Sequence, residues 1–161
     1  MDRLWTPWRF DYIRELGRDE SDCVFCTILE QHADHENFVL HRGTHAYIIL
    51  NLFPYTAGHL LIAANRHIPF LRDAEIDELR ELMDLARQCE LALRREYNPD
   101  GFNLGFNLGR AAGAGVEHHL HMHLVPRWVG DANFVSVVAE TRVLPEELRR
   151  TYDRLKAYFP S

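Results

Sequence analysis

Residues 119–125, His-Leu-His-Met-His-Leu-Val, alternate between imidazole and apolar side chains. Successive side chains of a β-strand point to opposite faces, so this segment would place its three histidines on one face and its leucines and methionine on the other. Such a strand can bury its apolar face against a helix while the imidazoles line the opposite surface. The chain is therefore expected to form a sheet with two chemically different faces.

Other segments predict the neighbours of this strand. Two apolar runs rich in β-forming residues flank the turn Arg42-Gly43-Thr44 and predict a hairpin. A third apolar run follows a loop that contains Pro54 and Gly58, and a fourth segment alternates with a period of two. Together these patterns predict four further strands at 38–41, 46–50, 59–64 and 102–108.

Three segments predict helices. Apolar residues recur at three- and four-residue steps from Asp73 to Tyr97, and Asn98-Pro99-Asp100-Gly101 ends the pattern, which indicates one long amphipathic helix. Residues 24–30 predict a short helix, and residues 145–159 predict a C-terminal helix that begins with Pro145 and two glutamates. The fold class is therefore α+β, with an antiparallel sheet of about five strands, one long helix and a C-terminal helix.

Length and composition favour one domain over residues 1–161, because 161 residues with 47% hydrophobic content match one globular core and no repeat or linker divides the chain. The aromatic and then charged residues 1–22 are expected to form an irregular segment docked on that domain. Cys89 lies on the apolar stripe of the long helix and is expected to serve packing.

The charge balance limits the classes of partner. The chain has 18 Lys and Arg against 24 Asp and Glu, a net charge of −6, so it lacks a broad basic field for a nucleic-acid polymer. No apolar run approaches the roughly 20 residues that span a bilayer, and the N-terminus lacks the pattern of a secretory signal. We therefore expect a cytoplasmic protein with neither a nucleic-acid polymer nor a membrane as its partner.

A loop of small residues precedes the histidine strand. Residues 109–115, Gly-Arg-Ala-Ala-Gly-Ala-Gly, can expose backbone N–H groups, and such concavities bind anions. Three aligned imidazoles likewise suit a phosphate or a metal ion. The adjacency of loop and strand predicts a site at this end of the sheet.

These residues carry a resemblance to a known family. Residues 119–125 resemble the motif that gives the histidine triad superfamily of nucleotide hydrolases and transferases its name, and Asn51 with Gly58-His59 resembles the family's ribose-binding position and its fourth active-site histidine. Blocks over most of the chain resemble the bacterial branch named diadenosine tetraphosphate phosphorylase-like: 4–9, 50–55, 101–109 and 126–134.

The resemblance implies an enzyme that cleaves adenine dinucleoside polyphosphates through a covalent nucleotidyl-histidine on His121. It implies that His123 and nearby backbone amides meet the phosphoryl charge and that His59 orients or polarises His121, whereas a histidine satisfied by backbone is the alternative for His59. The implied catalytic residues are His59, His119, His121 and His123. The implied substrate-binding residues are Asn51, Asn107, Gly113 and Gly115, although Asn107 could equally cap the loop backbone.

The sequence departs from the superfamily at one place. Many members carry Ser, Thr or Gln shortly before the first histidine, whereas this chain has Gly113-Ala114-Gly115-Val116. Backbone amides or Arg110 can replace the missing side-chain donor, so the leaving group stays open. Hydrolysis of nucleoside phosphoramidates, or nucleotide binding without turnover, are the alternative functions, and relatives imply a homodimer formed through the long helix and an edge strand.

Cys23 and Cys26 have the spacing of a zinc knuckle, but a tetrahedral site requires two more ligands from elsewhere in the fold. The resemblance to zinc-containing histidine triad proteins implies His67 and His119, which would give a structural zinc site. His118 could replace His119 if the local register differs. A redox dithiol is the alternative for the cysteine pair.

Overall fold

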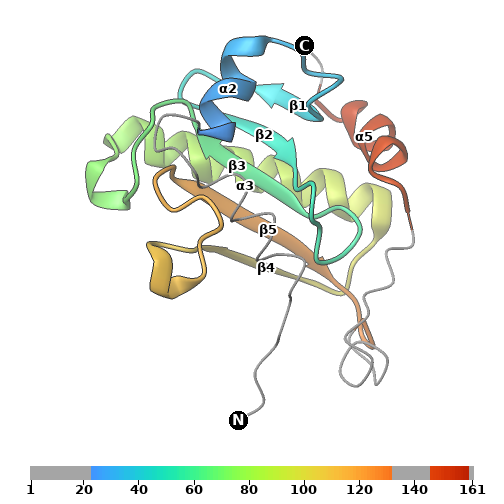
Figure 1. Ribbon diagram of the computed structural model, residues 1–161. Helices are drawn as coiled ribbons and strands as arrows, with labels where there is room; N and C mark the ends of the chain where they lie inside the picture. Colours follow the sequence, from blue (N-terminus) through green and yellow to red (C-terminus); the bar gives the residue numbers. More distant parts are fainter. Residues whose placement is uncertain (1–22, 132–145, 160–161) are drawn as a thin grey trace.

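The computed structural model describes residues 23–131 and 146–159, so the expected docked segment 1–22 lies outside the described residues. The C-terminal helix, expected over residues 145–159, begins at Leu148 and ends at Lys156. Figure 1 shows one sheet with helices on both sides. The elements in chain order are α2 Val24–Gln31, β1 Val39–Arg42, β2 Ala46–Leu50, β3 Leu60–Ala64, the 3₁₀ turn η1 Leu71–Asp73, α3 Ile76–Tyr97, β4 Gly101–Phe106, the 3₁₀ turn η2 Arg110–Ala112, β5 His121–Arg127 and α5 Leu148–Lys156.

The sheet is antiparallel, with the strand order β1-β2-β3-β5-β4. The α+β fold predicted from the sequence, with five strands, one long helix and a C-terminal helix, is therefore confirmed. In the register that matters most here, Leu61 lies opposite His123 and Ala63 lies opposite His121. The histidines of β5 therefore lie on the same face of the sheet as Leu61 and Ala63 of β3.

The histidine strand begins later than the alternation predicts, at His121 instead of His119. The reason is a change of hydrogen-bond partner at Leu120. Its carbonyl still accepts the Ala64 N–H at 3.0 Å, but its own N–H donates to the Ile68 carbonyl at 2.6 Å, beyond the end of β3. This pairing holds the start of the strand against the loop that follows β3.

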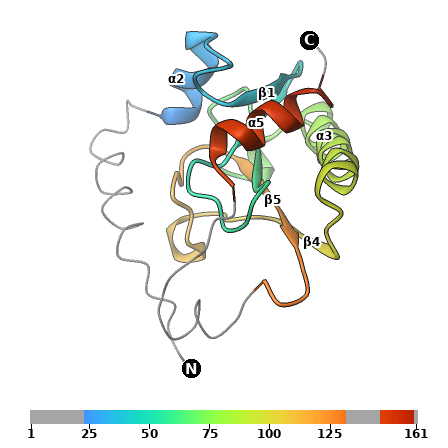
Figure 2. The ribbon, with the colours of Figure 1, turned by 90° about the vertical axis from the view of Figure 1, so that its right-hand side faces the viewer.

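Figure 2 shows α3 on one side of the sheet and α2 on the other. The larger apolar cluster lies between the sheet and helices α3 and α5, and it contains Leu120, immediately before β5, and Met122 and Leu124 of β5, together with the fully buried Cys89. The predicted apolar face of the histidine strand and the predicted packing role of Cys89 are confirmed. The fold thus uses one face of β5 entirely for stability.

A smaller cluster lies on the opposite face, beneath α2. Phe25 and Ile28 of α2 pack there against β1, β2 and β3, and the Tyr47 hydroxyl donates to the Phe25 carbonyl at 2.9 Å within the core. The three histidines lie on this side of the sheet, yet His119 and His121 are only 2% and 6% exposed. They are therefore buried beneath α2 and its neighbouring loops, and they do not form the open surface line expected from the sequence.

Helix α3 begins at Ile76, three residues after the predicted start, because η1 occupies Leu71–Asp73. A capping box closes its first turn: the Glu75 side chain accepts a backbone N–H and the buried Glu78 carboxylate accepts the Glu75 N–H at 2.7 Å. Glu78 also accepts two hydrogen bonds of 2.7 Å from Arg66. The ion pair thereby ties the loop after β3 to the long helix.

Among residues 23–131 and 146–159, no helix has both the length and the apolar content that crossing a bilayer requires.

Glu78 generates a prediction about stability. The Arg66 hydrogen bonds lower the pKa of the Glu78 carboxyl from 4.5 to about 2. Replacing Glu78 with Gln should reduce the free energy of unfolding at pH 7 by about 1.5–3 kcal/mol, because hydrogen bonds to a charged group are lost. The depressed pKa means that this contribution is present above about pH 4.5 and is lost as the pH falls towards 2.

Urea unfolding at pH 7 and at pH 3 measures the effect, and the difference between wild type and Glu78→Gln should narrow at pH 3. The control is Glu90→Gln, which removes an exposed ion pair with Arg94 on the same helix and should cost less than about 0.5 kcal/mol. Equal losses for the two variants at pH 7 would contradict the role assigned to Glu78.

Candidate active site and metal cluster

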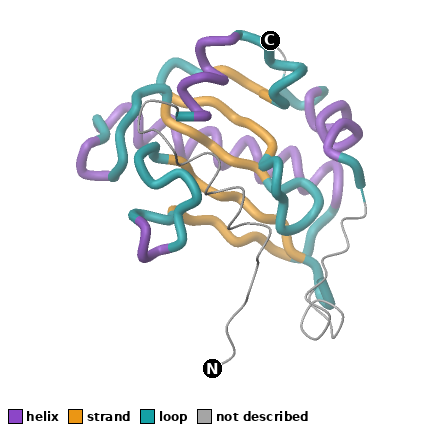
Figure 3. The backbone as a smooth tube through the Cα atoms, viewed as in Figure 1, coloured by secondary structure: helices purple, strands orange, loops and turns teal. Residues whose placement is uncertain are grey.

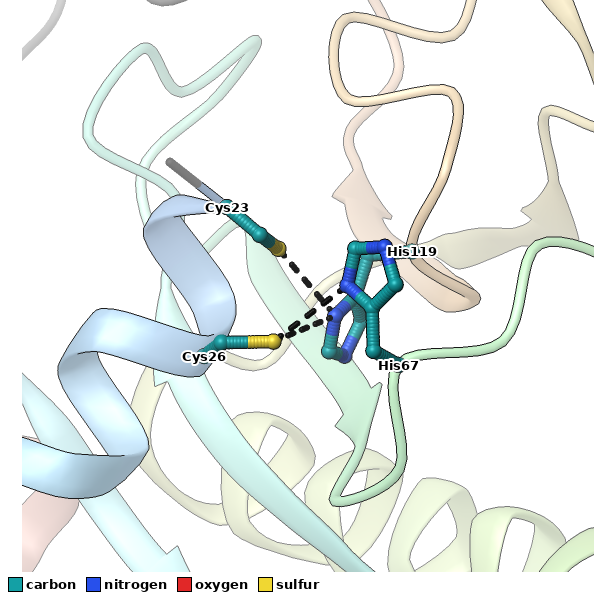
Figure 4. A group of neighbouring side chains, drawn as sticks. All are labelled: Cys23, Cys26, His67 and His119. Carbon is teal, nitrogen blue, oxygen red and sulfur yellow. Dashed lines mark hydrogen bonds between the residues drawn. The ribbon is translucent and has the colours of Figure 1, made fainter. Parts of the chain in front are cut away.

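Four side chains from three parts of the chain converge beside the start of α2, as Figure 4 shows. They are Cys23 and Cys26 at the N-terminus of α2, His67 in the loop after β3, and His119 immediately before β5. Their ligand atoms all lie within 4.8 Å of one another. Cys23 Sγ is 3.2 Å from His119 Nδ1, and Cys26 Sγ is 3.3 Å from His67 Nδ1.

The His119 ring is held in the form that binds a metal. Its Nε2–H donates to the Ala64 carbonyl at 2.7 Å, which leaves the Nδ1 lone pair directed at the two sulfur atoms. Burial lowers the pKa of His119 to about 4, so the imidazole is neutral at neutral pH. A backbone carbonyl that fixes the tautomer in this way is the usual support of a histidine ligand.

The cysteine pair is equally suited to a cation. Burial and the neighbouring Cys23 raise the pKa of the Cys26 thiol to about 11, and a bound cation would reverse this by stabilising the thiolate. Two thiols and two imidazoles form the donor set of closed tetrahedral zinc sites. His118 takes no part in the four-residue cluster: it is exposed, and its Nε2 lies 3.6 Å from Glu117. The geometry therefore selects His119 over His118.

His121 is oriented by its own strand. Its Nδ1–H donates to the main-chain carbonyl of His119 at 2.7 Å, which leaves the Nε2 lone pair on the other side of the ring. Burial lowers the pKa of His121, and the rings of Phe25 and His123 pack against its ring, with centroids 4.8 and 5.1 Å away. A neutral imidazole with an available Nε2 lone pair is a competent nucleophile.

A chain of contacts through His59 is compatible with the opposite tautomer in His123. The Tyr55 N–H donates to His59 Nδ1 at 3.1 Å, so the proton of neutral His59 resides on Nε2. That Nε2–H can donate to His123 Nδ1, also at 3.1 Å, which leaves a proton on His123 Nε2. Asn107 Nδ2 lies 3.5 Å from this atom, and because an amide nitrogen only donates, the Asn107 amide must turn its oxygen to His123 to accept this proton. With these tautomers, His121 and His123 sit side by side, one with a lone pair on Nε2 and the other with a proton there.

The contact of His59 within the histidine group is with His123. In the antiparallel register, Leu61 opposes His123, so His59 lies on the same face and diagonally across from His123. The observed contact of His59 is with His123, at 3.1 Å. The expectation that His59 orients or polarises His121 stays a prediction.

Asn51 and Gly58 shape the loop that carries this relay. The Asn51 side-chain oxygen accepts the Phe53 N–H at 3.0 Å, and its amide nitrogen lies 3.3 Å from His59 Nδ1. Gly58 has a φ of +76°, and a β-carbon there would lie 2.8 Å from the Leu93 side chain. The ribose-binding role of Asn51 stays a prediction, since its side chain already organises the loop before His59.

A cavity opens in front of His121 and His123. Figure 3 shows the loops at 51–59 and 107–120 at opposite ends of the central strands. One side of the cavity is apolar and includes Val24, Phe25 and Ile28 of α2, whereas Asn51, Gly115 and the two histidines supply polar groups. An apolar wall with a few convergent polar groups is the usual composition of a small-molecule site.

The two predicted phosphate-binding glycines are placed differently. Gly115 lines the cavity, whereas Gly113 ends η2 with a φ of +81° and has no described neighbour within 4 Å of the position of a β-carbon. Sequence reasoning missed Phe25 and Tyr55 as site residues. The sequence held one signal for each residue: Phe25 lies between the two cysteines, and Tyr55 lies between Asn51 and His59.

Comparison with known proteins identifies the family. The sequence model of the family described as HIT domain matches residues 32–129 of this chain. A relative from Mycobacterium tuberculosis named AP-4-A phosphorylase is 39% identical over 157 residues, which covers 94% of this chain and 80% of the relative. The protein belongs to the HIT family. The resemblance noted in the sequence is thereby confirmed.

Solved HIT structures agree with the fold. A zinc-bound histidine triad family protein from Mycobacterium smegmatis is 26% identical, with a TM-score of 0.69 over 84% of this chain and 91% of that one. Diadenosine triphosphate hydrolase from Plasmodium falciparum superposes with a TM-score of 0.61 over 76% of this chain and 74% of that one. At 18% identity, the second likeness shows the shared fold alone.

Proposed function

We propose that this HIT protein is a nucleotide-processing enzyme that cleaves adenine dinucleoside polyphosphates through a nucleotidyl intermediate on His121. The observation that carries the proposal is the arrangement of two imidazoles that line the cavity: the His121 Nδ1–H donates to the His119 carbonyl, which leaves the Nε2 lone pair for attack, and His59 Nε2 lies 3.1 Å from His123 Nδ1. Membership of the HIT family and the likeness to AP-4-A phosphorylase support the choice of substrate.

The proposed reaction has two displacements. In the first, His121 Nε2 attacks an α-phosphorus, the P–N bond forms, the P–O bond to the leaving polyphosphate breaks, and that oxygen takes the proton from His123 Nε2. In the second, phosphate or water attacks the same phosphorus, His123 Nε2 accepts the acceptor's proton, and the P–N bond breaks. His59 holds the His123 ring in place for both proton transfers.

The cavity suggests where the substrate lies. We place the base against the apolar wall formed by α2 and the ribose near Asn51, at the junction of the apolar and polar sides. The backbone amide of Gly115 and the ring of His123 would then face the phosphoryl oxygens, and the amide of Asn107 lies beside His123. Positively oriented donors at these points stabilise the charge of the transferring group without a basic surface.

Incubation with diadenosine tetraphosphate, with and without inorganic phosphate, tests the reaction. ADP plus ATP formed only with phosphate indicates phosphorolysis, and AMP plus ATP formed without phosphate indicates hydrolysis of the same intermediate. Two ADP would place the cleavage between the two β-phosphates and would contradict attack on the α-phosphorus. His121→Asn should lower the rate by about 10⁴-fold or more, because the nucleophile is lost. Full activity of His121→Asn would refute the covalent route. Cleavage of a nucleoside phosphoramidate but not of diadenosine tetraphosphate would refute the proposed substrate class and support a phosphoramidate hydrolase. Nucleotide binding without turnover would support a binding protein instead of an enzyme.

We further propose that Cys23, Cys26, His67 and His119 bind a structural Zn²⁺ ion, which supplies a cross-link between α2, the loop after β3 and the start of β5. The donor set, the fixed His119 tautomer and the likeness to a zinc-bound histidine triad protein support this site. Reduced thiols in such a site suit a reducing compartment, in keeping with the expected cytoplasmic location.

Elemental analysis checks the zinc proposal. Wild type should carry about one Zn²⁺ per chain, whereas Cys23→Ser should retain little and should melt at a lower temperature, because folding and metal binding are coupled. His118→Ala is the matched control, since His118 neighbours His119 but lies outside the cluster, and it should keep its zinc. Equal zinc content in wild type and Cys23→Ser would contradict the assignment.

We also propose a homodimer through α3 and the edge strand β4. This surface exposes Met83 and Leu104, which are 54% and 47% accessible, around a groove that Ala86, Phe102 and Leu124 also line. An isologous two-fold contact would place each apolar patch against the other.

Sedimentation velocity should detect a dimer for wild type and a monomer for Leu104→Glu combined with Met83→Glu, because charges would replace apolar contacts. The double variant Leu104→Met, Met83→Leu preserves the apolar surface and should remain dimeric. A monomeric wild type at micromolar concentration would exclude the proposed contact.

A further inference from the structure

Phe25 lies between the metal cluster and the proposed nucleophile. It sits in the first turn of α2, between Cys23 and Cys26, and it is only 4% exposed. Its ring packs against two imidazoles, with centroid distances of 5.1 Å to His119 and 4.8 Å to His121. One aromatic side chain therefore touches a member of the cluster and the residue proposed to react.

The main chain of Phe25 is fixed from two directions. The hydroxyl of Tyr47, a fully buried residue of β2, donates to the Phe25 carbonyl at 2.9 Å. On either side, Cys23 and Cys26 approach His119 with sulfur-to-Nδ1 distances of 3.2 and 3.6 Å. These contacts hold the backbone of the first turn of α2, so the ring has little freedom to move away from the imidazoles.

The position of Phe25 matters because His121 has two possible ring orientations. One hydrogen bond, from Nδ1–H to the His119 carbonyl, selects the orientation that leaves the Nε2 lone pair available. A rotation of the ring would exchange the nitrogen atoms for carbon atoms and break this bond. The rings of Phe25 and His123 pack against the His121 ring, with centroids 4.8 and 5.1 Å away, and therefore restrict such a rotation.

We propose that Phe25 is a positioning residue that holds the His121 ring in its reactive orientation and makes that orientation depend on the cysteine–histidine cluster. The proposal rests on the proposed function of His121, although the orientation of the ring can be measured without any substrate. It assigns to α2 a role beyond forming the cavity wall, because the same turn carries the two cysteines and the aromatic contact.

The test replaces Phe25 with Leu, which retains an apolar side chain but removes the flat ring. The primary measurement is the ¹⁵N spectrum of the histidine rings in the metal-loaded protein, with the His121 signals assigned from their loss in His121→Asn. Wild type should show His121 protonated on Nδ1 alone, whereas Phe25→Leu should show averaged Nδ1 and Nε2 signals. With diadenosine tetraphosphate, kcat should fall about 10- to 100-fold while KM changes less than about threefold.

Two further variants define the role. Phe25→Tyr retains the ring and should restore the Nδ1 tautomer and most of kcat. Leu29→Val removes volume from the same helix and the same apolar cluster, outside the cavity lining, and should leave the tautomer and kcat unchanged. A raised KM with an unchanged tautomer in Phe25→Leu would overturn the proposal and leave Phe25 as a wall of the cavity alone.

Dependence on the cluster is tested by a double-mutant cycle with Cys26→Ser. The single variant Cys26→Ser should also produce averaged His121 signals, and the double variant with Phe25→Leu should add little to either change, because both act through one contact. Additive changes, or an unaltered His121 tautomer in Cys26→Ser, would overturn the coupling. If wild type turns over no nucleotide, the proposed function fails while the ring measurement still decides the positioning role.

Discussion

The hydrogen bond between His121 Nδ1 and the His119 carbonyl is the interaction on which the site depends. Two parts of His119 contribute to the site, namely its ring and its main chain. Its ring belongs to the cysteine–histidine cluster and is fixed by the Ala64 carbonyl, while its main chain orients the next histidine along the strand. Because the ring anchors the main chain of His119, a change in the geometry of the cluster would also move the carbonyl that orients His121.

Around this bond, the fold separates stability from chemistry by the two faces of β5. Leu120, Met122 and Leu124 belong to the main apolar core with α3 and α5. The histidine face is covered by one short helix and by loops, which leaves a cavity. A rigid strand whose rear face is fully packed can hold side chains on its front face within the tolerances that catalysis requires.

The parts of this arrangement that depend on local periodicity could be predicted from the sequence. The alternation at residues 119–125 identified both faces of β5, and the three- and four-residue spacing identified α3, because each pattern is fixed by the geometry of one element. The late start of β5 could not be predicted, since it depends on the bond from Leu120 to Ile68 in a separate loop. The pairing of His59 with His123 likewise depends on the register between β3 and β5.

The metal ligands show the same limit. The spacing of Cys23 and Cys26 was informative by itself, but it could not distinguish His118 from His119 and relied on a family resemblance for His67. The role of Phe25 could not be predicted for a different reason. An aromatic residue in a short apolar helix is normally a core residue, and the contact of Phe25 with two imidazoles depends on how α2 lies over the sheet.

The cluster also has a consequence for the order in which the chain acquires its structure. Cys23 and His119 are separated by 96 residues, so their approach closes a loop that includes β1, β2, β3, α3 and β4. Contacts between such distant residues are entropically costly until the intervening elements are in place. We therefore expect the N-terminal turn of α2 to settle last, which means that a newly made chain completes its scaffold before it completes its reactive centre.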